Sequence, residues 1–135
     1  MENKHKHLEM IQGVINRMAN NSFLLKGWAV TLVAGIFALA NKDVNKIYFL
    51  IAYVPIVVFW GLDAYYLYKE RLYRKLYDKV CKTAEGDIDY SMNAALPEFM
   101  TYKLSYPHTL LSLTELGFYL PLGLLTAIVT ILSLQ

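Results

Sequence analysis

The chain has 135 residues, room for one domain, and 56% of them are hydrophobic against 18% charged. Soluble domains usually carry about 25% charged residues, so this composition favours a protein embedded in lipid. The net charge of +2 is too small to indicate a nucleic-acid partner, and the single cysteine, Cys81, excludes an intrachain disulfide.

Residues 1–22 predict an amphipathic helix on the cytoplasmic side of a membrane. Its apolar residues recur every three or four positions, the period of one helical face: Leu8, Ile11, Ile15 and Met18. This stripe either lies in the plane of the lipid headgroups or packs on another cytoplasmic helix. We expect residues 20–22 to interrupt the helix, with Ser22 as the cap of the following span.

Three later segments are apolar enough to cross a bilayer: residues 23–40, 47–66 and 110–134. A spanning helix needs roughly 20 residues, because it rises about 1.5 Å per residue through about 30 Å of hydrocarbon. Helices of soluble proteins show a polar face, and these segments do not. The sequence therefore predicts an all-α integral membrane protein with three transmembrane helices.

Lysine and arginine are distributed unevenly between the two predicted sides of the membrane. Of the 13 such residues, eleven lie before the first span, at its start, or between the second and third spans. The loop between the first two spans contains only Lys42 and Lys46. Because basic residues concentrate in cytoplasmic loops, we expect the N-terminus and the connector over residues 67–109 in the cytoplasm, and the C-terminus outside.

The connector is predicted to begin as a helical extension of the second span, since no helix breaker precedes Gly86. Glu70 and Arg74 are spaced four apart, as in a stabilising ion pair on a helix. Residues 86–93 indicate an acidic turn, and residues 94–100 a short helix.

Each span carries one ionisable residue near its cytoplasmic end: Lys26, Asp63 and Glu115. An ionisable side chain inside a membrane is costly, so it normally faces a partner, a cavity or water. One interpretation is a charged vestibule of a pore or ligand site. The other is that Lys26 pairs with one carboxylate while the remaining groups reach the headgroups.

A second candidate site lies at the end of the second span and on its extension and combines basic with aromatic side chains: Arg71, Arg74, Lys75, Tyr66 and Tyr73. Arginine forks suit phosphate oxygens, and tyrosine rings suit stacking on a base, so these residues could bind a nucleotide-like signal. The same residues also suit the membrane interface, with tyrosines at headgroup level and basic groups on anionic lipid.

Small residues and prolines in the spans predict how the helices pack. Gly27, Thr31 and Gly35 repeat every four positions, a pattern typical of close helix approach, either within this chain or with another copy. Pro55 and Pro121 lie near the middle of their spans and predict kinks.

The sequence contains no metal-ligand cluster, no glycine-rich phosphate loop and no nucleophile–base pair. His108 stands alone at the head of the third span. We therefore expect neither an enzyme nor a bound metal or cofactor.

Two stretches are distinctive: NSFLLKGW over residues 21–28 and FWGLDAYYLYKERLYRKLYD over residues 59–78. With the layout of a cytoplasmic helix, a tight pair of spans and a long cytoplasmic helix, they resemble the small membrane effectors of bacterial antiphage systems. In those systems a sensor makes a nucleotide-derived signal, and the effector oligomerises or opens to damage the inner membrane.

The resemblance implies a homo-oligomer that forms a pore in the bacterial inner membrane. It also implies that Arg71 and Arg74 contact the signal, and that Lys26, Asp63 and Glu115 line the cytoplasmic mouth of the pore. The third span departs from the two-span form of these effectors.

Two alternatives from other functional classes remain. A non-conducting scaffold would recruit a cytoplasmic partner through the amphipathic N-terminal helix and the helix over residues 63–82. A small homo-oligomeric transporter is the other alternative, although no charge lies at the membrane midplane, where transporter sites usually form.

Overall fold

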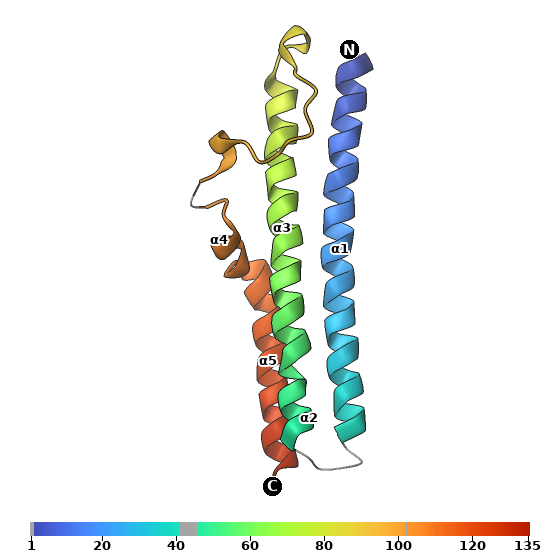
Figure 1. The fold of residues 1–135 in the computed structure, drawn as a ribbon, viewed down its shortest axis with the longest axis vertical. Coiled ribbons are helices and arrows are strands. Elements are labelled where there is room, and N and C mark those ends of the chain that lie inside the picture. The colour runs from blue at the N-terminus through green and yellow to red at the C-terminus, as the bar shows by residue number, and fades with distance from the viewer. Residues whose placement is uncertain (1, 41–45, 102) are drawn as a thin grey trace.

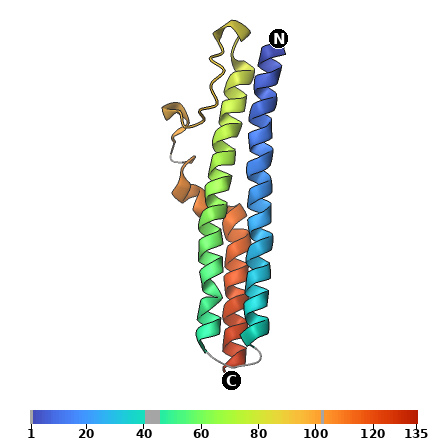
Figure 2. The ribbon, with the colours of Figure 1, turned by 45° about the vertical axis from the view of Figure 1, so that its right-hand side comes forward.

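The computed structural model describes residues 2–40, 46–101 and 103–135, and the long regular elements in these residues are helices. Three of them run side by side along one axis: α1 (Glu2–Ala40), α3 (Tyr53–Lys82) and α5 (Leu113–Ser133) (Figure 1). α1 and α3 extend over most of the length of the molecule, whereas α5 lies beside their lower half. The two termini therefore lie at opposite ends, as a second view also shows (Figure 2).

Each of the three helices is long and apolar enough to cross a membrane, as the composition predicts. Large apolar side chains on their outer faces are exposed, among them Phe23 at 73%, Leu124 at 65% and Val57 at 61%. An apolar surface of this extent is typical of a face that meets lipid or a partner. The predicted fold class, an all-helical chain with three helices able to span a membrane, is confirmed to this extent.

α1 is one continuous helix, so the interruption expected at residues 20–22 is wrong. Asparagine and serine favour helix caps because their side chains compete for backbone hydrogen bonds, but tertiary contacts can override this tendency. Ser22 is such a case, because its hydroxyl donates to the carboxylate of Asp63 on α3. The amphipathic segment and the first predicted span thus form a single rod.

The second predicted span consists of two helices, α2 (Lys46–Ile51) and α3, separated by Ala52. Pro55 explains this break, because a proline ring clashes with the carbonyl group four residues earlier, here that of Ile51. Pro121 instead lies inside α5, which continues on both sides of it. α3 runs on to Lys82, which confirms the expected helical extension beyond the span.

The parts of α1 and α3 that lie beyond α5 share an apolar core, which we term the upper core. Its buried residues come from both helices and from the connector after α3: Ile11, Ile15, Leu72, Leu76, Val80, Ala94, Phe99 and Leu104. The amphipathic stripe of α1 thus packs on another helix of the same chain. At the tip, the Lys4 ammonium donates to the carbonyl oxygens of Cys81, at 3.2 Å, and Thr83, at 2.9 Å.

The connector folds back along α3 in an extended conformation. It starts with a 3-10 turn, η1 (Glu85–Asp87), inside the predicted acidic segment. Three side chains then each accept a hydrogen bond from the backbone N–H two residues further on: Asp89, Ser91 and Asn93. The helix expected over residues 94–100 is reduced to a second 3-10 turn, η2 (Pro97–Phe99), because a residue before proline disfavours helical geometry.

A short helix, α4 (Tyr106–Leu110), leads from the connector into α5. The Tyr106 hydroxyl donates to the carbonyl oxygen of Gly61 at 2.8 Å and ties α4 to α3. Below it, α1, α3 and α5 share a second apolar cluster, the lower core: Ala29, Val33, Ile56, Tyr119 and Leu122. This packing brings the first turn of α5 against the middle of α1 and α3.

Candidate functional site

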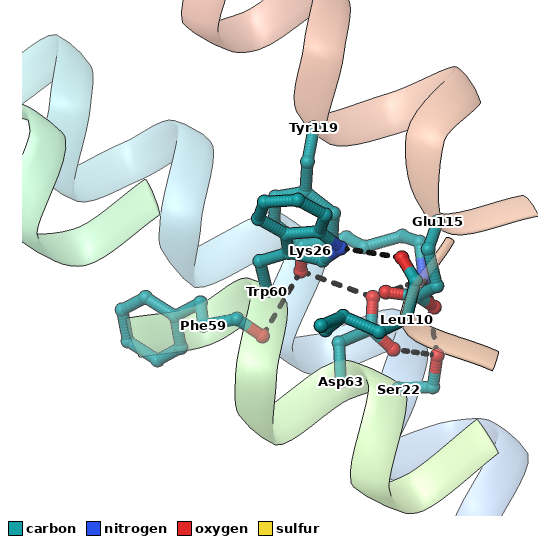
Figure 3. Close-up of polar contacts among 8 residues, drawn as sticks. All are labelled: Ser22, Lys26, Phe59, Trp60, Asp63, Leu110, Glu115 and Tyr119. Carbon is teal, nitrogen blue, oxygen red and sulfur yellow. Dashed lines mark hydrogen bonds and ion pairs between the residues drawn. The ribbon is translucent and has the colours of Figure 1, made fainter. Parts of the chain in front are cut away.

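The three ionisable residues of the predicted spans meet between the helices (Figure 3). Lys26 on α1 forms an ion pair with Asp63 on α3, and its Nζ lies 3.7 Å from Oε1 of Glu115 on α5. Asp63 and Glu115 have no exposed surface, while 20% of the Lys26 side chain is exposed. The structure therefore joins in one place three residues that are far apart in the sequence.

Asp63 is the best-satisfied member of this group. One carboxylate oxygen accepts a hydrogen bond from the Ser22 hydroxyl, and the other accepts from Lys26 and, at 3.0 Å, from the Tyr119 hydroxyl. Lys26 also donates to the Ser22 oxygen at 3.1 Å. Such a network is what a charged group needs when it leaves water. We call these five residues the charge cluster: Ser22, Lys26, Asp63, Glu115 and Tyr119.

Glu115 is held differently from Asp63. Both of its carboxyl oxygens are buried, and neither accepts a hydrogen bond from a residue that the structure describes. Its nearest opposite charge is Lys26, which already contacts Asp63 and Ser22. The hydroxyl oxygen of Ser112, the residue just before α5, is also buried with no partner among the described residues.

Aromatic rings close the cluster on the α5 side. Trp60 stacks on Tyr119 with ring centres 6.4 Å apart, and its indole N–H donates to the carbonyl oxygen of Leu110 at 3.0 Å. The Phe118 ring lies 5.9 Å from the Lys26 nitrogen, within the range of a cation–π contact. These rings place apolar surface beside the cluster, and electrostatic interactions are stronger in apolar surroundings than in water.

Lys26 pairs with a carboxylate, as one of the two interpretations from sequence expects. Glu115, in contrast with that interpretation, is fully buried between the helices. Ser22 and Tyr119 were missed as members of the site. Helical spacing could have found them, since Ser22 precedes Lys26 by four residues and Tyr119 follows Glu115 by four.

The predicted signal-binding residues all lie on α3 and form a less compact group. Arg74 donates to Oε1 of Glu70 through Nε at 3.1 Å and Nη2 at 2.7 Å, which confirms the predicted pair. Arg74 and Lys75 are exposed, whereas Arg71 and Tyr66 are half-buried. Tyr73 is also half-buried and packs against the upper core. Arg74 lines a hollow between the helices with Gln12, Ile15, Tyr77 and Asp78.

Two further surfaces expected from sequence can now be placed. Gly27, Thr31 and Gly35 are exposed, and a Cβ atom added at either glycine would meet nothing within 4 Å. This small-residue face therefore does not pack within the described chain. In contrast, Ile11 and Ile15, part of the surface expected of a scaffold, are buried in the upper core and not available to a partner.

Within residues 2–40, 46–101 and 103–135, no group of three or more histidine, cysteine, aspartate or glutamate side chains could hold a metal ion. Comparison of the chain with protein-family models, curated proteins and solved structures found no match. The functional argument therefore rests on the charge cluster and the surfaces around it.

Proposed function

We propose that the chain is an oligomeric antiphage effector that permeabilises the bacterial inner membrane when a nucleotide-derived signal arrives. The observation that carries this proposal is the charge cluster, in which ionisable side chains from three apolar helices meet inside the bundle. Ionisable residues in membrane segments are rare, and they mark ion pathways, proton relays or voltage sensors.

The cluster is closed in the single chain, since Asp63 and Glu115 have no exposed surface. This supports a resting state in which the polar groups satisfy one another. In the proposed active state, α1, α3 and α5 shift apart, and the same groups contact water between copies of the chain. Three helices are too few to surround an aqueous path, so the pore needs several protomers.

The small-residue face of α1 supports assembly into an oligomer. Gly27, Thr31 and Gly35 lie on the same helix as Lys26, and their face is unoccupied within the described chain. Small residues allow helix backbones to approach closely, which is how many membrane helices associate. A second copy packed there would lie beside the charge cluster.

The proposed orientation places the N-terminus and the upper core in the cytoplasm and the C-terminus outside. The uneven distribution of lysine and arginine along the sequence supports this orientation. The signal is proposed to bind on the cytoplasmic part of α3. Arg71 and Lys75 are the cationic groups to test first, because Arg74 already donates to Glu70. Arg71 lies about two helical turns, roughly 12 Å, from Asp63 on one rigid element.

Membrane potential in living bacteria tests the proposal. Cells would express the chain with or without its neighbouring genes, and a potential-sensitive dye would report depolarisation. We expect depolarisation only when the neighbouring genes are present and active, and its loss in Arg71→Gln. Lys103→Gln, an exposed change on the connector, is the matched control and should behave as the unaltered chain. A normal potential under all conditions, with the protein present in the membrane, would reject the proposed function.

A further inference from the structure

The charge cluster contains two carboxyl groups but only one ammonium group. Lys26 forms its close ion pair with Asp63, and its nitrogen is 3.7 Å from Glu115. If both carboxyl groups were ionised, one negative charge would remain uncompensated among buried side chains. A buried charge without compensation is very costly, and the usual remedy is that the group becomes neutral.

The hydrogen bonds identify which carboxyl group is neutral. Asp63 accepts hydrogen bonds from Ser22, Lys26 and Tyr119, and each of these stabilises its ionised form. Glu115 accepts none from the described residues, although both of its oxygens are buried. We infer that Glu115 is a proton-binding site, which holds one proton while α5 is docked against α1 and α3.

The groups around Glu115 favour a proton over a metal cation. From the neighbouring helices, Lys26 on α1 and Asp63 on α3 face it, and Tyr119 on α5 donates to Asp63 instead. His108 on α4 is exposed. A metal cation takes several oxygen ligands, but the oxygens of Asp63 are already engaged. The Lys26 ammonium would also repel a second cation, whereas a proton needs one oxygen of Glu115.

Proton binding at Glu115 is linked to the docking of α5. When α5 moves away, Glu115 meets water and ionises, and its proton passes to the solvent. The docked state therefore binds one more proton than the undocked state, so raising the pH favours undocking. This linkage does not depend on whether the chain forms a pore.

Infrared spectroscopy of the purified full-length protein in liposomes tests the inference directly. A protonated carboxylic acid has a carbonyl stretch that is separate from the amide and carboxylate bands. We expect this band near neutral pH in the unaltered chain. It should shift when glutamate carries a heavy isotope at its carboxyl carbon, and should not shift when aspartate is labelled in the same way.

Three variants test which carboxyl group carries the proton. Glu115→Gln should remove the band, while Glu98→Gln, an exposed carboxyl on the connector, should leave it unchanged. Lys26→Met should double the intensity of the band, because both Glu115 and Asp63 are then expected to carry a proton. Absence of the band in the unaltered chain, or a shift with labelled aspartate, would overturn the inference. A band that appears only after sodium is replaced by choline would assign the site to a metal cation instead.

Discussion

The hydroxyl of Ser22 donates to the carboxylate of Asp63 across 41 positions of sequence. This contact joins the two distinctive stretches of the sequence, residues 21–28 and 59–78, because Ser22 belongs to one and Asp63 to the other. Both residues are buried, and the contact fixes the register of α1 against α3 beside Lys26. Substitutions at these positions should therefore change the stability of the bundle.

Ser22→Ala should destabilise the bundle by about 1–3 kcal/mol, because it leaves a buried carboxylate oxygen without its hydrogen-bond donor. The free energy of unfolding in mixed micelles is the measurement. Asn20→Ala, two residues away on an exposed position of the same helix, is the control and should have little effect. Equal stability of the two variants would contradict the assigned role of Ser22.

The two partners of the central ion pair should respond unequally to neutralisation. Lys26→Met removes the one cation of the cluster and should cost about 3–5 kcal/mol, as when a buried pair loses a partner. Asp63→Asn should cost less, because Lys26 then pairs with Glu115 alone. Thermal unfolding of both variants in the same detergent shows which of them loses more stability. The reverse order would show that Glu115 does not belong to the same electrostatic group.

Adjacent residues on α1 should differ sharply in their sensitivity. Ile11 has no exposed surface, so Ile11→Ala should cost about 2–5 kcal/mol through the lost apolar contacts and the cavity that remains. Met10 is 59% exposed, and Met10→Ala should be nearly neutral. Limited proteolysis of α1 would show the difference as faster cleavage in the first variant. Similar cleavage of both would mean that the upper core is not formed in the membrane-bound protein.

The small-residue face should matter to assembly and not to the fold of the single chain. Gly35→Leu places a bulky side chain where the described chain has no neighbour within 4 Å of the new Cβ atom. We expect normal unfolding behaviour but a smaller assembly in cross-linking or mass measurements in detergent. Val57→Leu adds bulk to an exposed position on α3 and serves as the control. An unchanged assembly in Gly35→Leu would move the contact between copies to another face.

The elements of the fold were largely predictable from the sequence, because each long helix has a plain signal in the composition of its segment. Uninterrupted apolar segments of sufficient length predicted the three long helices, and the absence of a breaker before Gly86 predicted the extension of α3. The continuity of α1 through residues 20–22 was not predictable in this way. Local propensity favours a break there, and the contact that removes it comes from a helix far away in the sequence.

The ionisable residues of the candidate site were predictable from the sequence, but the contacts between them were not. Lys26, Asp63 and Glu115 stood out as ionisable residues near the ends of apolar segments. Which carboxylate pairs with Lys26 depends on how the helices are rotated about their axes, and the sequence does not give that rotation. The lack of a hydrogen-bond donor to the buried oxygens of Glu115 among the described residues likewise became visible only in three dimensions.

Because α1 has no break between Glu2 and Ala40, its two ends belong to one rigid element. Lys4 and Lys26 lie on this one helix, about 33 Å apart at the rise of an α-helix. A tilt of α1 at the end where Lys4 contacts α3 would therefore displace Lys26 relative to Asp63 without any rearrangement of the side chains between them. The distance over which such a tilt acts is then set by the length of the helix and not by a chain of contacting side chains.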